Sequence, residues 1–416
     1  MQPSPGLDPA LPALPQAFSF EAVASRLEAA VEGAEGRPVT VTSASLLDVK
    51  YEPGERCTVT YGLAGKGLSR ETIGVIEVDG AGVAARLFHE DAALPGLASA
   101  LDAAGMRERF AALPAGRIGM ASIEACAVAP VRYKPRLSCV LRYRLAGGGR
   151  EAIIFGKLVA GRWRELWSAL SALEALSASE ATMPRIPRSV GVWPEVDLVA
   201  QLEAPGESLG AAVFDRGSPA AEGTRLMRRA GRALGALHTC AGVTAPRRTL
   251  GDDVADLRGY RTLFVRLAPE LLGMFDDAVG ALARFASLLP EPPPVASHGT
   301  LRADHFLVDG SDVTLIDLDG FCSANPARDV GNLLAYLDWK AIRCPHAAGL
   351  VDEAENEFLR GYGAVARLSE RWLEIYRAAS MLKIAGRRLR SLRFDEWRLL
   401  PELLGRARRG LAGTSV

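Results

Sequence analysis

The sequence predicts an α+β fold in which a strand-rich first half precedes a mainly helical second half. Short runs of alternating apolar residues dominate the chain up to residue 203. After this point apolar residues recur at helical spacing, most clearly between Ser369 and Leu392. One predicted hairpin, within residues 297–321, interrupts the helical half.

Composition excludes several classes of protein. The chain has 416 residues, enough for two or three domains, and its formal net charge is zero, which argues against nucleic acid as a partner. No apolar run approaches the roughly 18 residues that span a bilayer, and the first 16 residues lack the features of a secretory signal. The six cysteines form no CxxC pair, and the five histidines have no metal-ligand spacing, which argues against a zinc site. We expect a cytoplasmic protein without membrane association, and its oligomeric state stays open.

An internal repeat lies in the strand-rich half. Residues 49–65, VKYEPGERCTVTYGLAG, align without gaps on residues 131–147, VRYKPRLSCVLRYRLAG, with 8 of 17 positions identical. Each copy predicts a strand, a turn at Pro and a second strand. Chance similarity in a biased composition is the alternative. We favour a duplicated β unit because Tyr, Pro and Cys are among the identities.

Further elements follow the second copy. Residues 150–159 predict a third strand, residues 163–176 a helix, and residues 197–203 another strand that ends before Pro205-Gly206. Helical patterns then occur in four segments: residues 222–240, 328–339, 354–362 and 369–392.

The segment from Ser297 to Phe321 carries the most information about chemistry. The β-prone runs 306–308 and 313–316 flank Asp309-Gly310, a strong hairpin signal. Asp317 follows the second strand directly. A hairpin that holds loop polar groups beside a strand-end carboxylate suits a metal-bound phosphate.

This segment resembles the catalytic loop of the aminoglycoside phosphotransferase and choline kinase group, within the protein-kinase-like superfamily. The pattern of that group, H-G-D-x-x-x-x-N followed by a hairpin and I-D, corresponds here to His298-Gly299, Thr300, His305 and Ile316-Asp317. The resemblance covers roughly residues 125–400. Thr300 and His305 depart from the pattern, since the group has Asp and Asn at these positions.

The resemblance implies a bilobal protein-kinase-like fold with a small β-rich N-lobe, a larger helical C-lobe and an extra N-terminal β unit. The expected boundaries are a flexible arm at 1–20, an N-terminal β unit resembling a partial N-lobe at 21–120, the N-lobe at 121–203, and the C-lobe at 204–416 with its catalytic hairpin at 297–321.

The resemblance also implies a site for ATP (or GTP). Lys157, on the third strand of the second copy, would hold the phosphates. Glu165 and Glu174 on the following helix could each orient it, and the spacing in the family favours Glu174. An ordinary edge lysine and exposed helix glutamates are the structural alternatives. The hinge backbone that meets the adenine would come from Gln201, Leu202 and Glu203.

Mg²⁺ is the implied metal, and Asp317 is its expected ligand, with Asp319 as a second candidate. A pair of turn aspartates is the structural alternative. His305 stands at the second metal position, but imidazole is a poor ligand for Mg²⁺, so a hydrogen bond to phosphate or substrate is the other interpretation. Asp329 is expected to brace the loop backbone around Gly299.

The two departures decide the functional hypotheses. A threonine hydroxyl is no base at neutral pH, so Thr300 weakens acid–base catalysis unless Asp304 takes the role. The leading hypothesis is a kinase that transfers the γ-phosphate to a hydroxyl of a small metabolite. The alternative is a catalytically impaired pseudokinase that acts as a nucleotide- or ligand-binding regulatory module, which Thr300, His305 and the glycine-poor turn 135–138 favour. Transfer of another group, such as a nucleotidyl moiety, is a third hypothesis, and the acceptor stays open.

Overall fold

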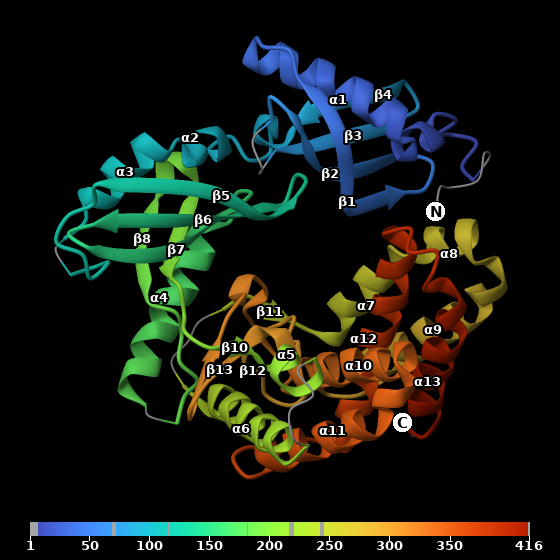
Figure 1. Cartoon of the computed structure of the whole chain (residues 1–416). Coiled ribbons are helices and arrows are strands. Elements are labelled where there is room, and N and C mark those ends of the chain that lie inside the picture. The colour runs from blue at the N-terminus through green and yellow to red at the C-terminus, as the bar shows by residue number, and fades with distance from the viewer. Residues whose placement is uncertain are drawn as a thin grey trace. The chain divides into compact units, whose positions relative to one another are not determined.

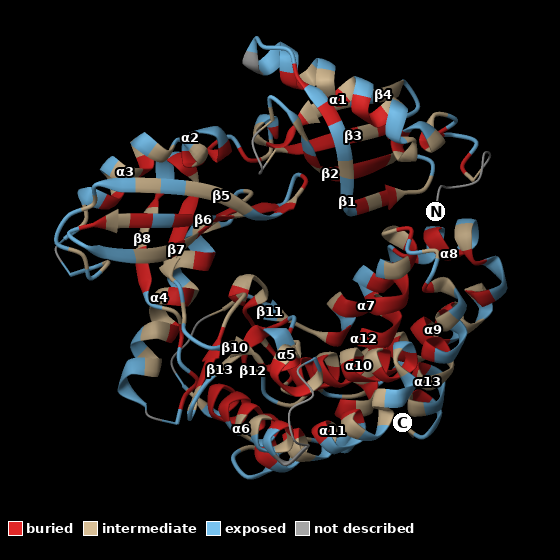
Figure 2. Cartoon of the chain, in the orientation of Figure 1, coloured by how far each residue is buried: buried red, intermediate tan, exposed pale blue. Residues whose placement is uncertain are grey.

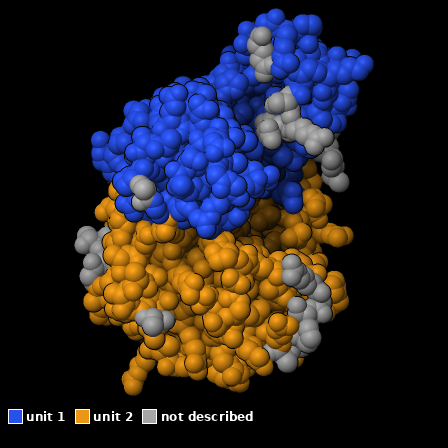
Figure 3. Space-filling view, turned by 60° about the vertical axis from the view of Figure 1, so that its left-hand side comes forward, with its two compact units in different colours: residues 1–164, 189–203, 390–393 blue, residues 165–188, 204–389, 394–416 orange. Residues whose placement is uncertain are grey.

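The computed structural model describes residues 7–68, 72–114, 116–180, 182–215, 220–241 and 245–414. Its architecture confirms the predicted α+β class, with sheets in the first half and mostly helices later (Figure 1). The chain forms two compact units (Figure 3). Unit 1 comprises residues 1–164, 189–203 and 390–393, and unit 2 comprises residues 165–188, 204–389 and 394–416.

The first module of unit 1 is a helix on an antiparallel sheet of order β1-β2-β3-β4. Its elements are α1 (Phe20–Glu35), β1 (Thr40–Glu52), β2 (Arg56–Lys66), β3 (Ile73–Asp79) and β4 (Gly82–Leu87). Helix α1 ends at Gly36, whose positive φ of 67° stops the helix in the left-handed region. The helix packs so closely on the sheet that a Cβ at Gly74 would lie 2.6 Å from the side chain of Leu27.

The second module of unit 1 repeats this plan with a five-stranded antiparallel sheet of order β5-β6-β7-β9-β8. Its elements are α2 (Leu97–Leu101), α3 (Ala103–Ala111), β5 (Ala125–Lys134), β6 (Ser138–Gly147), β7 (Arg150–Val159), β8 (Ser189–Trp193) and β9 (Leu198–Leu202). One face of the sheet is buried, because Ile154, Gly156 and Leu158 of β7 alternate with less buried residues. The β5–β6 and β1–β2 hairpins are the two copies of the sequence repeat.

The residues expected to form an arm, 1–20, differ from that prediction where the structure describes them. Residues 1–6 lie outside the described residues, but residues 14–18 form a short 3-10 helix and Leu11, Leu14 and Ala17 are buried. Burial of these apolar side chains offsets the extended tendency of the neighbouring prolines. The segment is therefore part of the first module.

Unit 2 is mainly helical, and it contains most of α4 (Trp163–Ser179), which we expected in the N-lobe. Its other helices are α5 (Leu209–Phe214), α6 (Ala220–Thr239), α7 (Leu250–Arg258), α8 (Arg261–Leu267), α9 (Leu272–Leu288), α10 (Ala327–Arg343), α11 (Ala348–Gly363), α12 (Glu370–Arg390) and α13 (Leu400–Ala412). Helices α10 and α12 are buried along most of their length (Figure 2). Among the described residues, no helix combines the length and apolar character needed to cross a bilayer.

Two small sheets of unit 2 position the candidate site. One has the order β10-β13-β14, from β10 (Glu207–Ser208), β13 (Phe306–Asp309) and β14 (Asp312–Leu315). The other has the order β11-β15-β12, from β11 (Arg247–Arg248), β15 (Cys322–Ala324) and β12 (Val295–Ser297). The predicted hairpin is therefore β13–β14, with Asp309 opposite Asp312 and Gly310 at a φ of 54°. The loop of residues 298–305 joins the two sheets.

Candidate active site

The start of the loop is held by a buried carboxylate. Asp329, in the first turn of α10, accepts the backbone N–H of His298 at 2.6 Å and that of Gly299 at 2.7 Å. The side chain is completely buried. Burial favours the neutral acid, but the hydrogen bond from His238 and the nearby charges outweigh it, so the pKa of Asp329 lies below its ordinary value. An ionised Asp329 therefore fixes the loop backbone, as the sequence predicts.

Two further side chains support Asp329 and were not predicted from the sequence. His238 of α6 lies with its Nε2 atom 3.2 Å from Asp329 Oδ2. Its Nδ1 atom is 2.8 Å from the hydroxyl of Tyr362 on α11. Burial raises the pKa of that hydroxyl, so Tyr362 stays protonated and can donate to His238. A buried chain of hydrogen bonds thus connects α11 and α6 to the loop.

A close approach of two glycines fixes the shape of the loop. Gly299 has a φ of 84°, and a Cβ atom there would lie 2.0 Å from the carbonyl oxygen of Gly320. Only glycine fits this position without a shift of the backbone. Thr300 follows with an exposed side chain, and a Cβ at Gly320 would lie 3.2 Å from Thr300 Oγ1. Thr300, which stands where the motif has the catalytic Asp, thus lies beside the turn that follows Asp317.

Histidine side chains join the loop to the hairpin. His298 stacks on His305 with ring centroids 4.9 Å apart. Its Nε2 atom lies 2.9 Å from the carbonyl oxygen of Ile316, which can only accept, so His298 carries its proton on Nε2. His305 in turn has its Nε2 atom 3.6 Å from Asp317 Oδ2. The structure therefore brings His298, His305 and Asp317 together, as the loop motif predicts.

Asp317 has an unusual backbone. Its φ of 61° and ψ of 48° lie in the left-handed region, which a residue with a Cβ atom rarely adopts. Such conformations cluster at functional sites, where the surrounding structure enforces them. About one third of the Asp317 side chain is exposed, so the carboxylate is accessible at the end of β14. Asp319 lies in the 3-10 turn that follows, at residues 318–320, and is half-buried.

Arg302, which sequence reasoning missed, contacts His305, the residue at the second metal position of the motif. Its guanidinium nitrogens lie 2.9 Å and 3.2 Å from His305 Nε2. Because a guanidinium only donates, Nε2 is the accepting nitrogen of a neutral imidazole. The lone pair that a metal ligand needs is thus already engaged, beside a permanent positive charge. His305 is therefore not suited to bind a metal ion in this structure.

Asp317 by contrast fits Mg²⁺, which proteins bind through one or two carboxylates together with phosphate oxygens and water. Among the described residues, no group of three or more His, Cys, Asp or Glu side chains could hold a metal ion by itself. The predicted set of Asp317, His305 and Asp319 therefore forms no closed cage.

The side chain of Asp304 lies against helix α5. It belongs to the short 3-10 turn of residues 303–305, and a Cβ at Gly210 would lie 2.1 Å from its Oδ1 atom. Its carboxylate therefore packs over the first turn of α5. This contact does not favour Asp304 as a substitute for the missing base.

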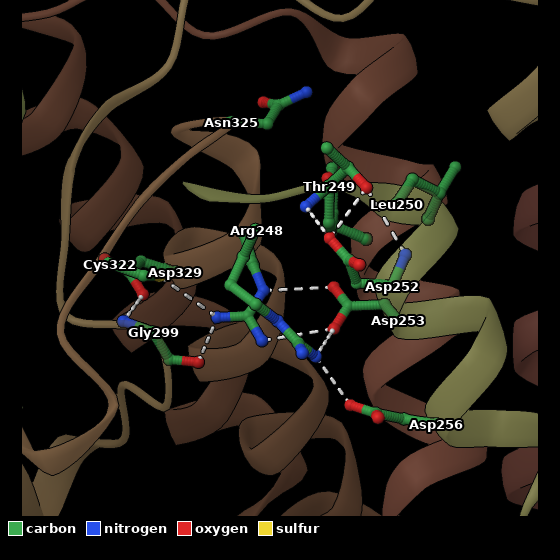
Figure 4. Close-up of polar contacts among 12 residues, drawn as sticks. Arg248, Thr249, Leu250, Asp252, Asp253, Asp256, Gly299, Cys322, Asn325 and Asp329 are labelled. Carbon is green, nitrogen blue, oxygen red and sulfur yellow. Dashed lines mark hydrogen bonds and ion pairs between the residues drawn. The ribbon is translucent and has the colours of Figure 1, made fainter. Parts of the chain in front are cut away.

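A buried ion cluster around Asp253 also supports the loop (Figure 4). Arg328 of α10 donates to the carbonyl oxygen of Gly299 and to both oxygens of Asp253 on α7, at 3.0 Å and 3.1 Å. Lys383 of α12 lies 2.6 Å from Asp253, and Arg248 lies 3.3 Å from it. Burial opposes ionisation, but Lys383 and Arg328 outweigh it and hold the pKa of Asp253 well below its ordinary range.

The predicted nucleotide residues lie in both units. Lys157 is on β7 of unit 1, opposite Val199 of β9, and its side chain is half-buried. Of the predicted hinge residues, Gln201 and Leu202 are also on β9, and the N–H of Glu203 donates to the carbonyl oxygen of Ile153 at 2.9 Å. Lys157 and the hinge thus share adjacent strands. Glu174 and Glu165 are on α4, in the part that belongs to unit 2.

Comparisons with known proteins agree with the loop motif. The model of the phosphotransferase enzyme family matches residues 173–375. No curated protein sequence matches the chain. A Ralstonia eutropha structure described as an aminoglycoside phosphotransferase is 14% identical, covers 70% of this chain and 94% of that chain, and has a TM-score of 0.50. A choline/ethanolamine kinase family protein from Mesorhizobium loti is 17% identical. The match covers 74% of this chain and 93% of that chain, and its TM-score is 0.43.

The amicoumacin kinase hAmiN, solved with AMP-PNP, Ca²⁺ and Ami, is 16% identical. The match covers 67% of this chain and 88% of that chain, and its TM-score is 0.49. At these identities the structural likeness concerns the fold alone, and it is the bilobal protein-kinase-like fold that the sequence predicts. Residues 173–375, which hold the loop, the hairpin and Asp329, match the model of the phosphotransferase enzyme family, as the motif predicted.

Proposed function

We propose that this protein transfers the γ-phosphate of ATP or GTP to a hydroxyl group of a small metabolite. One observation carries the proposal: Asp329 fixes the backbone of His298 and Gly299, which brings Thr300 beside the end of the hairpin where Asp317 stands. The site thus combines an exposed loop residue with an accessible carboxylate. This arrangement suits the acceptor and the phosphate of a transfer reaction.

The roles of the remaining residues follow from their chemistry. Lys157 would contact the nucleotide phosphates as a compact positive charge, with Glu174 as its orienting partner. The backbone of Gln201, Leu202 and Glu203 would meet the adenine edge. Mg²⁺, held by Asp317 and the phosphate oxygens, neutralises negative charge on the phosphates when bound. The family match of residues 173–375 includes Glu174, the hinge residues and Asp317 and supports their assignments, whereas Lys157 precedes the matched range.

Thr300 limits the chemistry without excluding it. Phosphoryl transfer passes through a loose transition state in which positioning and charge neutralisation dominate. Loss of a general base lowers the rate by a factor of about 10² to 10⁴. We therefore propose slow transfer, with Thr300 facing the acceptor and donating or accepting a hydrogen bond. We also keep the cytoplasmic location and the small-molecule acceptor as parts of this proposal.

A second candidate function has its own support. Arg302 engages the imidazole that replaces the second metal-binding residue, at 2.9 Å and 3.2 Å. A fixed positive charge there can hold a polyphosphate without turnover. With Thr300 in place of the base, the protein would then be a pseudokinase that binds nucleotide or another ligand as a regulatory module.

Thermal unfolding tests what both candidates share. We expect ATP with MgCl₂ to raise the melting temperature of the wild-type protein, and Asp317→Asn to abolish that rise. Asp309→Asn is the matched control, because Asp309 is an exposed carboxylate on the same hairpin. If neither ATP nor GTP shifts the wild-type melting temperature, the kinase and the nucleotide-binding form of the pseudokinase are both wrong.

Turnover then separates the two candidates. Hydroxylated metabolites are screened for stimulation of ADP release from ATP. Stimulation by one of them, together with a lower rate of ADP release in Lys157→Ala, would support the kinase. Nucleotide binding without ADP release on any acceptor would support the pseudokinase.

A further inference from the structure

The sequence repeat is part of a longer structural repeat in unit 1. In the first copy, the carboxylate of Asp8 accepts the hydroxyl of Tyr51 at 2.7 Å and the backbone N–H of Gly54 at 2.7 Å. Gly54 is the turn residue of the β1–β2 hairpin and has a φ of 75°. A buried aspartate before α1 thus holds the tip of the following hairpin.

The second copy repeats these bonds. Asp91 accepts the hydroxyl of Tyr133 at 2.6 Å and the backbone N–H of Arg136 at 2.7 Å. Tyr133 and Arg136 stand 82 residues after Tyr51 and Gly54, the offset of the sequence repeat. The duplication therefore begins at the aspartate and includes the helix and the hairpin of each module.

Strand register identifies the counterpart of Lys157 in the first copy. Lys157 lies opposite Val140 in the β6–β7 pair, and Glu77 lies opposite Thr58 in the β2–β3 pair. Thr58 and Val140 are aligned positions of the repeat. A carboxylate thus stands in the first module where the proposed phosphate-binding lysine stands in the second. The first module has the opposite charge at this position, so phosphate binding there is disfavoured.

Glu77 has another partner, in the second module. Its Oε2 atom lies 3.1 Å from the guanidinium of Arg136, and its Oε1 atom lies 3.4 Å from that of Arg86. Arg86 also donates to the hydroxyl of Tyr133 at 3.2 Å. The second hairpin is thus tied to the first module through the side chains of Arg136 and Tyr133, while Asp91 of its own module holds the backbone of its tip.

The backbone conformation of Arg136 indicates that the contact with Glu77 holds the turn in a fixed shape. Its φ is 63°, in the left-handed region where the first copy has Gly54. A long side chain is strained there, and strain persists where the surroundings enforce it. The turn of residues 135–138 also lacks the glycines that commonly cover nucleotide phosphates, so its shape must be fixed by other means.

A shared core joins the two modules and makes the tie rigid. Ile73 and Val75 of β3 belong to one buried cluster with Tyr133, Leu141 and other residues of the second sheet. The side chains of Glu77 and Arg136 therefore meet across modules that already pack together. An ion pair between rigid elements loses less conformational entropy than one between mobile side chains.

We propose that the first module is a duplicated nucleotide-binding module that now clamps the 135–138 turn of the second, with Glu77 and Arg136 as positioning residues. The nucleotide part of this inference rests on the proposed function. The clamp pre-organises the turn beside Lys157, which lies two residues from the end of β7 that pairs with Ser138. Pre-organisation lowers the cost of ordering this turn when phosphate binds.

Hydrogen exchange of the full-length protein tests the clamp without nucleotide. The amides of Arg136 and Leu137 are bonded to Asp91 and to the carbonyl oxygen of Lys134. We expect Glu77→Ala and Arg136→Asn each to raise their exchange rates by about two- to fivefold, the range for a partly exposed ion pair. Asparagine tolerates the left-handed conformation, so Arg136→Asn removes the guanidinium and keeps the turn. Glu55→Ala, at the exposed tip of the first hairpin, is the control.

Coupling and rescue separate positioning from general destabilisation. The double variant Glu77→Ala/Arg136→Asn should exchange no faster than Glu77→Ala alone, because the guanidinium of Arg136 acts through Glu77. Arg136→Lys should retain most of the protection. Independent, multiplicative effects in the double variant, or unchanged exchange in Glu77→Ala, would overturn the clamp.

Calorimetry with Mg-ATP tests the nucleotide part. Glu77→Ala and Arg136→Asn should each weaken binding by about two- to fivefold, again without additivity, and Arg136→Lys should restore it. Equal affinity in the wild type and Glu77→Ala would overturn the nucleotide part and leave the proposed function standing. If the wild type binds no nucleotide, the proposed function fails, while the exchange rates still confirm or overturn the clamp.

Discussion

The buried carboxylate of Asp253 offers the sharpest test of how unit 2 holds its catalytic loop. Asp253→Asn keeps the size of the side chain and removes its charge. Arg328 and Lys383, which lie 3.0 Å and 2.6 Å from Asp253, would then be buried without a compensating charge. Removal of one partner from a buried ion pair costs about 3 to 5 kcal/mol in the free energy of unfolding.

This loss is large compared with the stability of a typical domain, which is about 5 to 15 kcal/mol. For a unit of this size, each kcal/mol lowers the melting temperature by about 2 to 4 °C, so we expect a decrease of about 6 to 20 °C. Arg328 also donates to the carbonyl oxygen of Gly299, so the variant should weaken nucleotide binding as well.

Differential scanning fluorimetry measures the effect, and Asp256→Asn is the control. Asp256 pairs with the same Arg248, at 2.6 Å, but its side chain is 54% exposed (Figure 4). Pairs of this kind contribute about 0 to 1 kcal/mol. A melting temperature for Asp253→Asn within about 2 °C of that for Asp256→Asn would refute the claim that the buried cluster stabilises unit 2.

Three further predictions follow from the same geometry. Thr300→Asp should increase the rate of phosphate transfer by a factor of about 10² to 10⁴ in a steady-state assay, and an unchanged or lower rate would mean that Thr300 has a role of its own. Gly299→Ala should cost about 1 to 3 kcal/mol in urea unfolding, because its Cβ would meet the carbonyl oxygen of Gly320, whereas Gly310→Ala, with open space around it, should cost less. The pKa of Asp253 is lower in the folded than in the unfolded state, so the folded state binds fewer protons and the stability that Asp253 provides is lost as pH falls below about 4. The melting temperature of the wild type should therefore fall more steeply on acidification than that of Asp253→Asn, and parallel curves would contradict this assignment.

Local patterns predicted the elements well. The β13–β14 hairpin follows from two β-prone runs around Asp309-Gly310, and helix α12 follows from its apolar spacing. The bracing role of Asp329 followed from the motif, and its hydrogen bonds to His298 and Gly299 confirm it. These successes depend on residues close together in the sequence or on a motif with fixed spacing.

Contacts between distant segments were not predictable in this way. Asp253 and Lys383 are 130 residues apart, and His238 and Tyr362 are 124 apart, so no local pattern links them. The described part of the arm expected at residues 1–20 packs on the first module because three apolar side chains are buried in a core that only the folded sheet supplies. The role of Arg302 was missed because its guanidinium acts through His305, which is three residues away on a turn that periodicity does not describe.

The wide separation of the Asp253 partners has a consequence for synthesis of the chain. A ribosome makes Asp253 and Arg328 well before Lys383, so the nascent polypeptide emerges with one of its neutralising cations still missing. Proteins are made at about 5 to 20 residues per second, which leaves an interval of several seconds. During that interval Asp253 can pair with Arg328 but not with Lys383, so the charge cluster behind Gly299 is completed only when α12 has been made.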